Sequence, residues 1–450
     1  MVGITSSNQN DLEGNIAAAL LLGSFPGLLV QPYANDTFGR KMCISLFSVV
    51  FVIGSVLQTF AWDYWSLVLG RMVSGFGLAV MMISISMYNS EVAPTHIRGQ
   101  IIGVQQLMVA TGIAIAYWTN YFMAESSVQG QGVFRIPLGM QIVPCIMLLV
   151  GVQFVPKSPR WLLTKGRTIE ALESLMVLRE LGPTDPILLD ELLQMSDALE
   201  DRDESKWIQV LEPANLKRFS VGITILVFQQ FAGQNLINYF APTMFKQMGL
   251  TSGNSDLFAT GFVGIDKMVM SLPGLYFVDR LGRRPLMLFG TVVMAASFYT
   301  IGVYTQFFND GHVGLMGYIA IGCVYTFMAA YSMSWGVLHY IIPAEIYPQH
   351  VRAKSETVGA LFEGAFNILS VKLAPVILHS QSGGGTFFIF GALLTVFLVW
   401  IFVSFPETKG LALEDVDVVF STWKRWKPIS AQTIEANRQE RIQQRKANIA

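Results

Sequence analysis

The sequence predicts an all-α membrane protein made of two helix bundles that are related by a same-direction internal repeat. Three observations support this prediction. The chain is 52% hydrophobic and only 14% charged, whereas soluble domains carry roughly 25% charged residues. Several segments are apolar over the length of about 20 residues that a membrane helix needs. Motifs of the first half also recur about 250 residues later, as expected for two homologous bundles in parallel orientation.

The repeat is carried by short charged motifs rather than by the apolar segments. Each motif keeps its acidic and basic residues at the same spacing in both halves, which favours duplication over chance. The recurring motifs are EVAPTHIR at 91–98 and EIYPQHVR at 345–352, DTFGRK at 36–41 and DRLGRR at 279–284, and more loosely PKSP at 156–159 and PETK at 406–409.

Eleven apolar segments are the expected membrane spans, five in the first bundle and six in the second. The polar segment between the bundles, 156–218, has helical patterns and is expected to form short surface helices. The tail from 405 to 450 is polar and basic. In chain order the spans are 14–34, 43–61, 66–90, 100–123 and 136–155, then 219–243, 257–277, 286–307, 314–342, 356–379 and 386–404.

Sidedness follows from the basic residues, because cytosolic loops carry an excess of Lys and Arg. Most of the 30 basic residues lie in the loops at alternate span ends and in the tail, and the opposite loops hold only Arg135 and Lys246. The sequence therefore predicts that 156–218 and 405–450 are cytosolic. Eleven spans then place 1–13 outside the cell.

The repeat also predicts that the first bundle lacks one helix. The second bundle has a span at 219–243 before its DRLGRR loop and the span preceding it, but the first bundle has no counterpart. A truncated gene product is the favoured explanation, and a natural five-plus-six variant is the alternative. A truncated chain is expected to transport poorly.

Composition excludes several other classes of protein. The net charge of −1 does not suit a nucleic-acid partner, and the three cysteines and five histidines are scattered without metal-ligand spacing. No phosphate loop or nucleophile motif appears. We therefore expect no enzyme activity, no cofactor and no metal.

At its motifs the chain resembles the sugar porter family of the major facilitator superfamily, especially its fungal members. The resemblance covers residues 14 to about 417 and rests on several signatures that occur in order. It implies the major facilitator fold. The signatures include Gly39-Arg40-Lys41, Gly70-Arg71, Glu91 to Arg98, Ser158-Pro159-Arg160, Gln229-Gln230 with Asn235, Gly282-Arg283-Arg284, Glu345 to Arg352 and Pro406-Glu407-Thr408.

The charged residues at the cytosolic helix ends have two interpretations. They could simply anchor the helices on the cytosolic side, or they could form ion pairs that break when the cytosolic mouth opens. Family members use these motifs as an inner gate, so the resemblance favours the second interpretation. The candidate gating residues are Asp36, Arg40, Glu91, Arg98, Asp279, Arg283, Glu345 and Arg352.

Amide side chains within the spans are the candidate substrate ligands, because polar residues there are costly and usually functional. On an unbroken helix Gln229, Gln230 and Asn235 would not share a face. A break at Gly233 could turn all three toward one cavity. The resemblance matches them, and Gln106, to sugar-contacting positions, whereas interhelical hydrogen bonding is the plainer alternative. Tyr239 and Trp335 are candidates for stacking on a sugar.

Two charged residues depart from the pattern of hexose carriers. Lys267 and Glu363 each stand where the family usually has Asn, so a plain hexose is in doubt. They could pair with each other, which we favour, or Lys267 could await a substrate carboxylate while Glu363 binds hydroxyls or exchanges protons. Arg71 is a candidate coupling residue, because its counterpart in proton-coupled members faces an acid on the first helix. A structural pair within its bundle is the alternative.

The function expected from this resemblance is transport of a small hydrophilic solute, such as a sugar, polyol or sugar acid, by alternating access, with proton symport as an option. An exporter of a fungal secondary metabolite is the alternative. A nutrient sensor and an inactive truncated transporter are further alternatives, although sensors of this family carry longer cytosolic tails. We expect a monomer in the plasma membrane whose partners are the substrate, lipid and, where coupled, protons.

Overall fold

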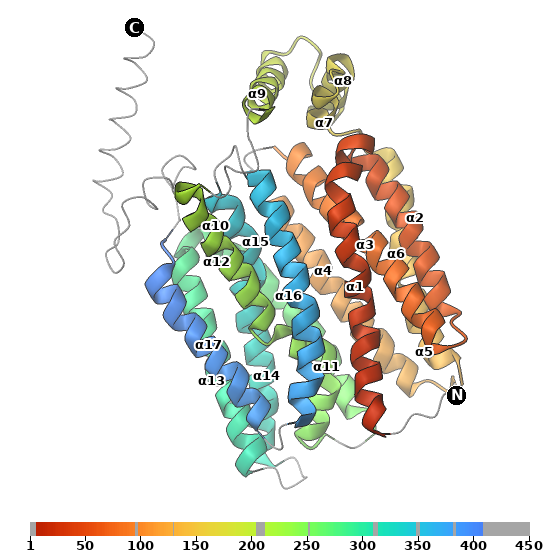
Figure 1. Cartoon of the computed structure of the whole chain (residues 1–450), viewed down its shortest axis with the longest axis vertical. Helices are drawn as coiled ribbons and strands as arrows, with labels where there is room; N and C mark the ends of the chain where they lie inside the picture. Colours follow the sequence, from red (N-terminus) through yellow and green to blue (C-terminus); the bar gives the residue numbers. More distant parts are fainter. Residues whose placement is uncertain are drawn as a thin grey trace. The chain divides into compact units, whose positions relative to one another are not determined.

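The computed structural model describes residues 6–94, 98–128, 130–203, 212–250, 253–308, 314–347, 352–380 and 384–407. Within these ranges all regular structure is helical. Figure 1 shows the helices in sequence colours. They are α1 (Ser6–Phe38), α2 (Arg40–Thr59), α3 (Tyr64–Val92), α4 (Arg98–Glu125), α5 (Gly132–Met140), α6 (Ile142–Gly151), η1 (Val152–Phe154), α7 (Pro159–Thr164), α8 (Thr168–Arg179), α9 (Pro186–Asp203), α10 (Pro213–Phe231), α11 (Gln234–Gln247), α12 (Ser255–Leu281), α13 (Arg283–Phe307), α14 (Leu315–Met333), α15 (Trp335–Ile346), α16 (Arg352–Ser380) and α17 (Gly385–Ser404).

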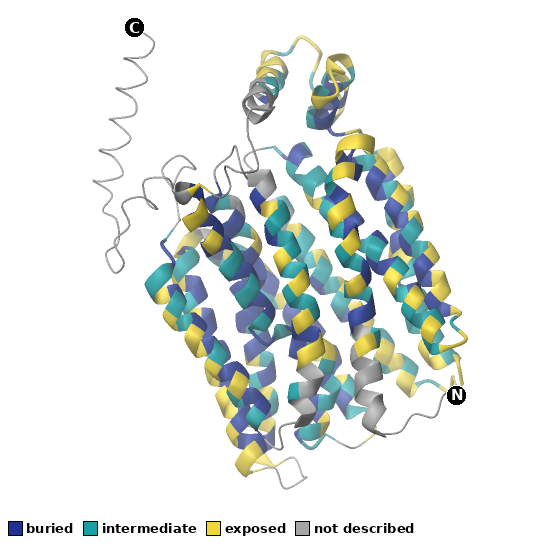
Figure 2. Cartoon of the chain, in the orientation of Figure 1, coloured by how far each residue is buried: buried dark blue, intermediate teal, exposed yellow. Residues whose placement is uncertain are grey.

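Eight helical segments in the described ranges are long and apolar enough to cross a membrane. They lie on α2, α3, α4, the α5–η1 run, α12, α13, the α14–α15 run and α17. The other three expected spans correspond to α1, the α10–α11 run and α16, which are helical and fall outside that length and hydropathy criterion. Large apolar side chains such as Val396, Val399 and Phe402 are exposed along α17 (Figure 2), as expected of a helix that contacts lipid.

The chain divides into two compact units. Unit 1 contains Met1–Glu204, Asn235–Ile265 and Ala360–Ser382, and unit 2 contains Ser205–Gln234, Asp266–Gly359 and Gly383–Ala450. Three helical runs of the second half are therefore shared: α10 and α11 separate at Gln234, and both α12 and α16 are cut within the helix.

Unit 1 packs its first three helices closely at glycines. A Cβ on Gly75 of α3 would lie 2.0 Å from the Leu20 carbonyl oxygen of α1, so only glycine allows this approach. The core between α2, α3 and α6 contains Cys43, Phe47, Val80 and Cys145. Small residues at helix contacts are the usual means of close packing in membranes, where lipid removes the hydrophobic driving force between helices.

Unit 2 is built around α13, whose side chains meet those of α14 and α17. The ring of Phe298 on α13 lies 4.4 Å from that of Phe327 on α14 and 6.0 Å from that of Phe390 on α17, measured between centroids. Gly290 of α13 lies against Ser334, between α14 and α15, and a Cβ there would be 2.0 Å from the Ser334 hydroxyl. Within unit 2, α10 and α13 also pack against α15, which follows the break after α14.

Candidate functional site

The run α10–α11 is interrupted at Gly233, where the break was expected. α10 ends at Phe231, Gly233 has φ +94° and α11 begins at Gln234. A residue with a Cβ would be strained at this φ, and its Cβ would also lie 2.3 Å from the Phe298 ring. The break releases backbone groups and allows Gln229 and Asn235 to face different surroundings.

Gln229 is buried in unit 2 and bonded across the bundle. Its Nε2 donates to the hydroxyl of Tyr331 on α14 at 2.6 Å and to Gln234 Oε1 at 3.2 Å. Its Oε1 is buried and accepts no hydrogen bond from the described residues. Gln230 is also buried and has interactions of its own. Gln229 is therefore an amide with a fixed donor and an unused acceptor.

Lys267 lies against the same tyrosine. It is 3% exposed on α12, and its Nζ is 5.9 Å from the centroid of the Tyr331 ring. Its carboxyl neighbour Asp266 points elsewhere, because adjacent residues on a helix do not face each other, and Asp266 Oδ2 is itself buried without a partner in the described residues. We call Gln229, Lys267, Tyr331 and the histidine described next the polar cluster of unit 2.

The break between α14 and α15 places the fourth member, His339. Ser334 leaves helical geometry with φ −116° and ψ −85°. His339 is 3% exposed, and its Nδ1 lies 2.6 Å from the Trp335 carbonyl oxygen, so Nδ1 carries the proton and Nε2 is an acceptor. Trp335 is fully buried, and its single N–H donates to the Thr291 hydroxyl at 2.9 Å.

Unit 1 holds a second set of amides. The Nδ2 of Asn235 on α11 lies 3.4 Å from both Asn367 Oδ1 and Ser370 Oγ of α16. The Gln106 side chain on α4 is half-buried and makes no hydrogen bond with the described residues. Glu363 on α16 is half-buried and has a partner. Its expected pairing with Lys267 joins residues of different units and stays a prediction.

Arg71 and Tyr239 also belong to unit 1. The Arg71 side chain is half-buried on α3, donates to the Ile16 carbonyl at 3.5 Å and has a buried Nε without a partner among the described atoms. Tyr239 is 44% exposed and lies near Arg71.

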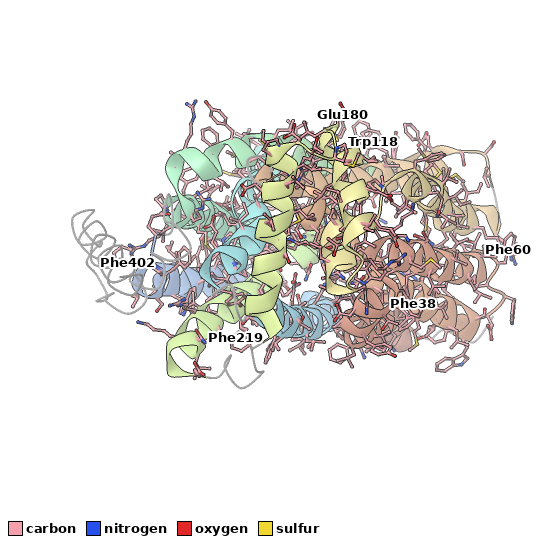
Figure 3. All side chains as sticks on the ribbon, turned by 90° about the horizontal axis from the view of Figure 1, so that it is seen from above. Phe38, Phe60, Trp118, Glu180, Phe219 and Phe402 are labelled. Carbon is pink, nitrogen blue, oxygen red and sulfur yellow. The ribbon has the colours of Figure 1, made fainter. Side chains whose placement is uncertain are left out.

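Unit 1 also joins α4 to α11 and α12. The Tyr117 hydroxyl donates to the Asn238 carbonyl at 2.6 Å, and Asn254 Nδ2 donates to Glu125 at 3.1 Å. Trp118, labelled in Figure 3, has its ring 5.8 Å from Phe258 and 5.4 Å from Phe262. These contacts bind the ends of α11 and α12 from the second half to the first bundle.

The motif charges form matched ion pairs inside each unit. Arg40 on α2 bonds Glu91 on α3 at 2.7 Å, and Arg283 on α13 bonds Glu345 on α15 at 2.7 Å. In both halves the arginine also donates to a carbonyl five residues earlier, at 3.2 Å. Asp36 is 79% exposed and lies 3.9 Å from Arg40. The side chains of Arg98, Asp279 and Arg352 lie outside the described residues.

The two halves of the chain differ at the third recurring motif, which is PKSP at 156–159 and PETK at 406–409. Glu407 accepts hydrogen bonds from the backbone N–H groups of Arg283 and Arg284 at 2.9 and 3.0 Å, which neutralises the start of α13. In the first half Lys157 occupies the matching position. It lies 3.5 Å from Glu170, whose pKa is lowered by the hydrogen bond from Arg167. Ser158 instead donates to Glu91 at 2.5 Å.

Sequence reasoning missed Tyr331, His339, Asn367 and Ser370. Tyr331, Asn367 and Ser370 are distinguished only by their partners on other helices. His339 bonds to the Trp335 carbonyl of its own helix. His339 offered the clearest signal, because an ionisable residue inside a span is a candidate by default. Among the residues described, no group of three His, Cys, Asp or Glu could hold a metal ion.

The sequence matches the family described as "Sugar (and other) transporter" over residues 2–420. It is 33% identical to the high glucose sensor RGT2 of Saccharomyces cerevisiae over 90% of this chain, and spans 54% of that protein's length. It is 30% identical to a probable quinate permease of Aspergillus clavatus, covering 93% of this chain and 80% of that one. It is also 30% identical to a high-affinity glucose transporter of Kluyveromyces lactis, covering 91% and 78%.

The fold matches solved structures of the major facilitator superfamily. The proton:xylose symporter XylE superposes with a TM-score of 0.78 at 24% identity, over 93% of this chain and 91% of that one. A partially occluded inward-open form of XylE from E. coli gives 0.78 at 23%, over 91% of each chain. These matches confirm the predicted fold class.

Proposed function

Because this chain belongs to the sugar (and other) transporter family, we propose that it carries a small polyhydroxylated solute across a membrane by alternating access. The family consists of transporters and not enzymes, as the sequence predicts. The curated relatives include proteins named for glucose and for quinate, and both compounds are small, built on a six-membered ring and rich in hydroxyls. We further propose a single chain in the plasma membrane as the working unit.

The helix break at Gly233 is the observation that carries this proposal. Alternating access needs two bodies that rock about a central site, with broken helices at that site. Here the helical run α10–α11 breaks at Gly233, between the amides Gln229 and Asn235. Amides suit a neutral polyol because each offers both a donor and an acceptor.

Two sets of contacts support a gate at each end. Arg40–Glu91 and Arg283–Glu345 lie at the motif ends of their helices, which the basic loops predict to be cytosolic. Tyr117–Asn238 and the aromatic contacts of Trp118 lie toward the opposite helix ends. Each of these two sets of contacts stabilises one state of the transport cycle only if its contacts are absent from the other state.

Uptake in yeast cells that lack their own hexose carriers is the direct test. We expect this chain, expressed with an epitope tag to verify surface delivery, to bind at least one labelled solute among D-glucose, D-xylose, myo-inositol and quinate and to take it up at a measurable rate. Collapsing the proton gradient distinguishes symport, which stops, from facilitated diffusion, which continues. Surface-delivered protein that neither binds nor moves any of these solutes contradicts the proposal.

A sensor is the second candidate, because the 33% identical relative is named as one. A sensor binds its ligand but does not move it. Purified protein that is stabilised by D-glucose, with no uptake into proteoliposomes, would favour this candidate over transport.

A further inference from the structure

We propose that the substrate is a hydroxy acid, and that Lys267 binds its carboxylate while Gln229 accepts a hydrogen bond from one of its hydroxyls. This inference rests on the proposed transport function and narrows its substrate class. It starts from the polar cluster of unit 2, which combines a buried cation with a buried acceptor beside one tyrosine.

Lys267 is a charge without an anion. It is 3% exposed inside a span, and no carboxylate in the described part of its own unit lies within ion-pair distance of its Nζ. A lysine in that position is costly unless a partner or water compensates the charge. Among the described residues its ammonium contacts the Tyr331 ring, and a cation–π contact compensates an ammonium only partly.

The neighbouring groups are neutral and do not supply the missing anion. The Tyr331 hydroxyl already accepts a hydrogen bond from Gln229 Nε2 at 2.6 Å. His339 has its proton on Nδ1, directed to the Trp335 carbonyl, so it offers a lone pair and no negative charge. Among the described residues of unit 2 no anion neutralises Lys267, so an entering ligand is the source of the missing negative charge.

The unused acceptor oxygen of Gln229 further restricts the class of ligand that fits this cluster. Gln229 Oε1 is buried, accepts no hydrogen bond from described groups and belongs to a side chain whose donor is fixed by Tyr331. A buried acceptor without a donor is unfavourable, so a ligand hydroxyl that donates to it is favoured. A carboxylate paired with Lys267 and a hydroxyl directed at Gln229 together describe a hydroxy acid.

A neutral sugar satisfies only half of this cluster. It can donate to Gln229 Oε1, but it leaves the Lys267 ammonium buried and unpaired. This unpaired charge makes binding of a neutral sugar less favourable than binding of an acid. The alternative is that Glu363 of the other unit neutralises Lys267. An internal Lys267–Glu363 pair predicts that exchanging the two charges restores uptake, whereas a substrate contact predicts that it does not.

Matched acid and neutral ligands test the proposal without any variant. Quinate is compared with its methyl ester, and D-glucuronate with D-glucose, by thermal stabilisation of the purified full chain and by uptake into proteoliposomes. We expect at least one acid to bind at least tenfold more tightly than its neutral counterpart. Binding of the neutral members alone overturns this inference and leaves transport standing, whereas binding of none overturns both.

Substitution of Lys267 assigns the carboxylate contact. Lys267→Asn should weaken binding of the acid by about 30-fold or more, as truncation of one buried charged partner does, and should leave its neutral counterpart within about threefold. Lys267→Arg, which keeps the charge, should retain more acid binding than Lys267→Asn. Lys246→Gln is the matched control, because Lys246 is 62% exposed and pairs with Asp256. Equal acid binding by Lys267→Asn and the unsubstituted chain overturns the assignment.

Charge exchange separates the substrate contact from an internal ion pair. Lys267→Glu combined with Glu363→Lys should lose acid uptake as fully as Lys267→Glu alone if Lys267 binds substrate. Recovery of uptake in the double variant, relative to both single variants at equal surface level, would instead establish the internal pair and overturn the inference.

Discussion

The guanidinium of Arg40 forms two hydrogen bonds with the carboxylate of Glu91, at 3.0 Å from Nε and 2.7 Å from Nη2, and both side chains are buried. Ser158 adds a third bond to the same carboxylate. The equivalent pair of the second half, Arg283–Glu345, is more open, with exposed fractions of 12% and 26%. The two halves therefore contain the same Arg–Glu ion pair, which is more deeply buried in the first half than in the second.

This difference predicts unequal effects of removing the two arginines. Arg40→Ala leaves Glu91 as an unpaired buried charge, which typically destabilises a protein by about 3–5 kcal/mol. Arg283→Ala should have a smaller effect, because water can reach Glu345. Thermal unfolding of the purified chain in detergent measures both, with Asp36→Asn as the control for an exposed, long pair worth about 0–1 kcal/mol. Equal melting temperatures for the two alanine variants would contradict the ranking.

Gly233→Ala should impair transport more than expression. The new side chain would have to adopt φ +94° and displace Phe298, and a non-glycine residue in such a conformation typically costs about 1–3 kcal/mol. Gly322→Ala on α14 is the matched control, because its Cβ would meet no atom within 4 Å. Uptake rates normalised to surface protein test this, and normal uptake by Gly233→Ala would show that the break is dispensable.

The candidate substrate amides should each contribute to affinity. Gln106→Ala, Gln229→Ala and Asn235→Ala each remove a potential hydrogen bond, which is worth about 1–3 kcal/mol when the partner is left buried and so weakens binding roughly 5- to 150-fold. Gln153→Ala, at an exposed position on η1, should bind normally. Competition with a labelled substrate is the readout, and unchanged affinity in all three variants would refute the assignment.

The predicted sidedness can be tested with single cysteines in a background without Cys43, Cys145 and Cys323. Ser127 follows α4 and Thr184 lies between α8 and α9, and both are exposed. We expect Ser127→Cys to react with an impermeant maleimide in intact cells, and Thr184→Cys to react only after permeabilisation. Labelling of both in intact cells would be incompatible with the charge distribution of the loops.

The sequence by itself determined the helical class, the repeat and the break at Gly233. These features depend on local properties, namely apolar run length, motif spacing and the conformational freedom of one glycine. The family followed from the same motifs, because their order along the chain is specific.

Only the tertiary structure decided which partner each polar side chain takes. Gln229 meets Tyr331, 102 residues away, and Trp335 gives its N–H to Thr291 rather than leaving it for a ligand. Such pairs depend on which helices pack together and at what rotation, and an apolar sequence encodes helix rotation weakly because every face is hydrophobic. For the same reason the sequence left Lys267 between an internal ion pair and a substrate contact, whereas its surroundings in unit 2 hold a tyrosine ring, a neutral histidine and an unused amide oxygen.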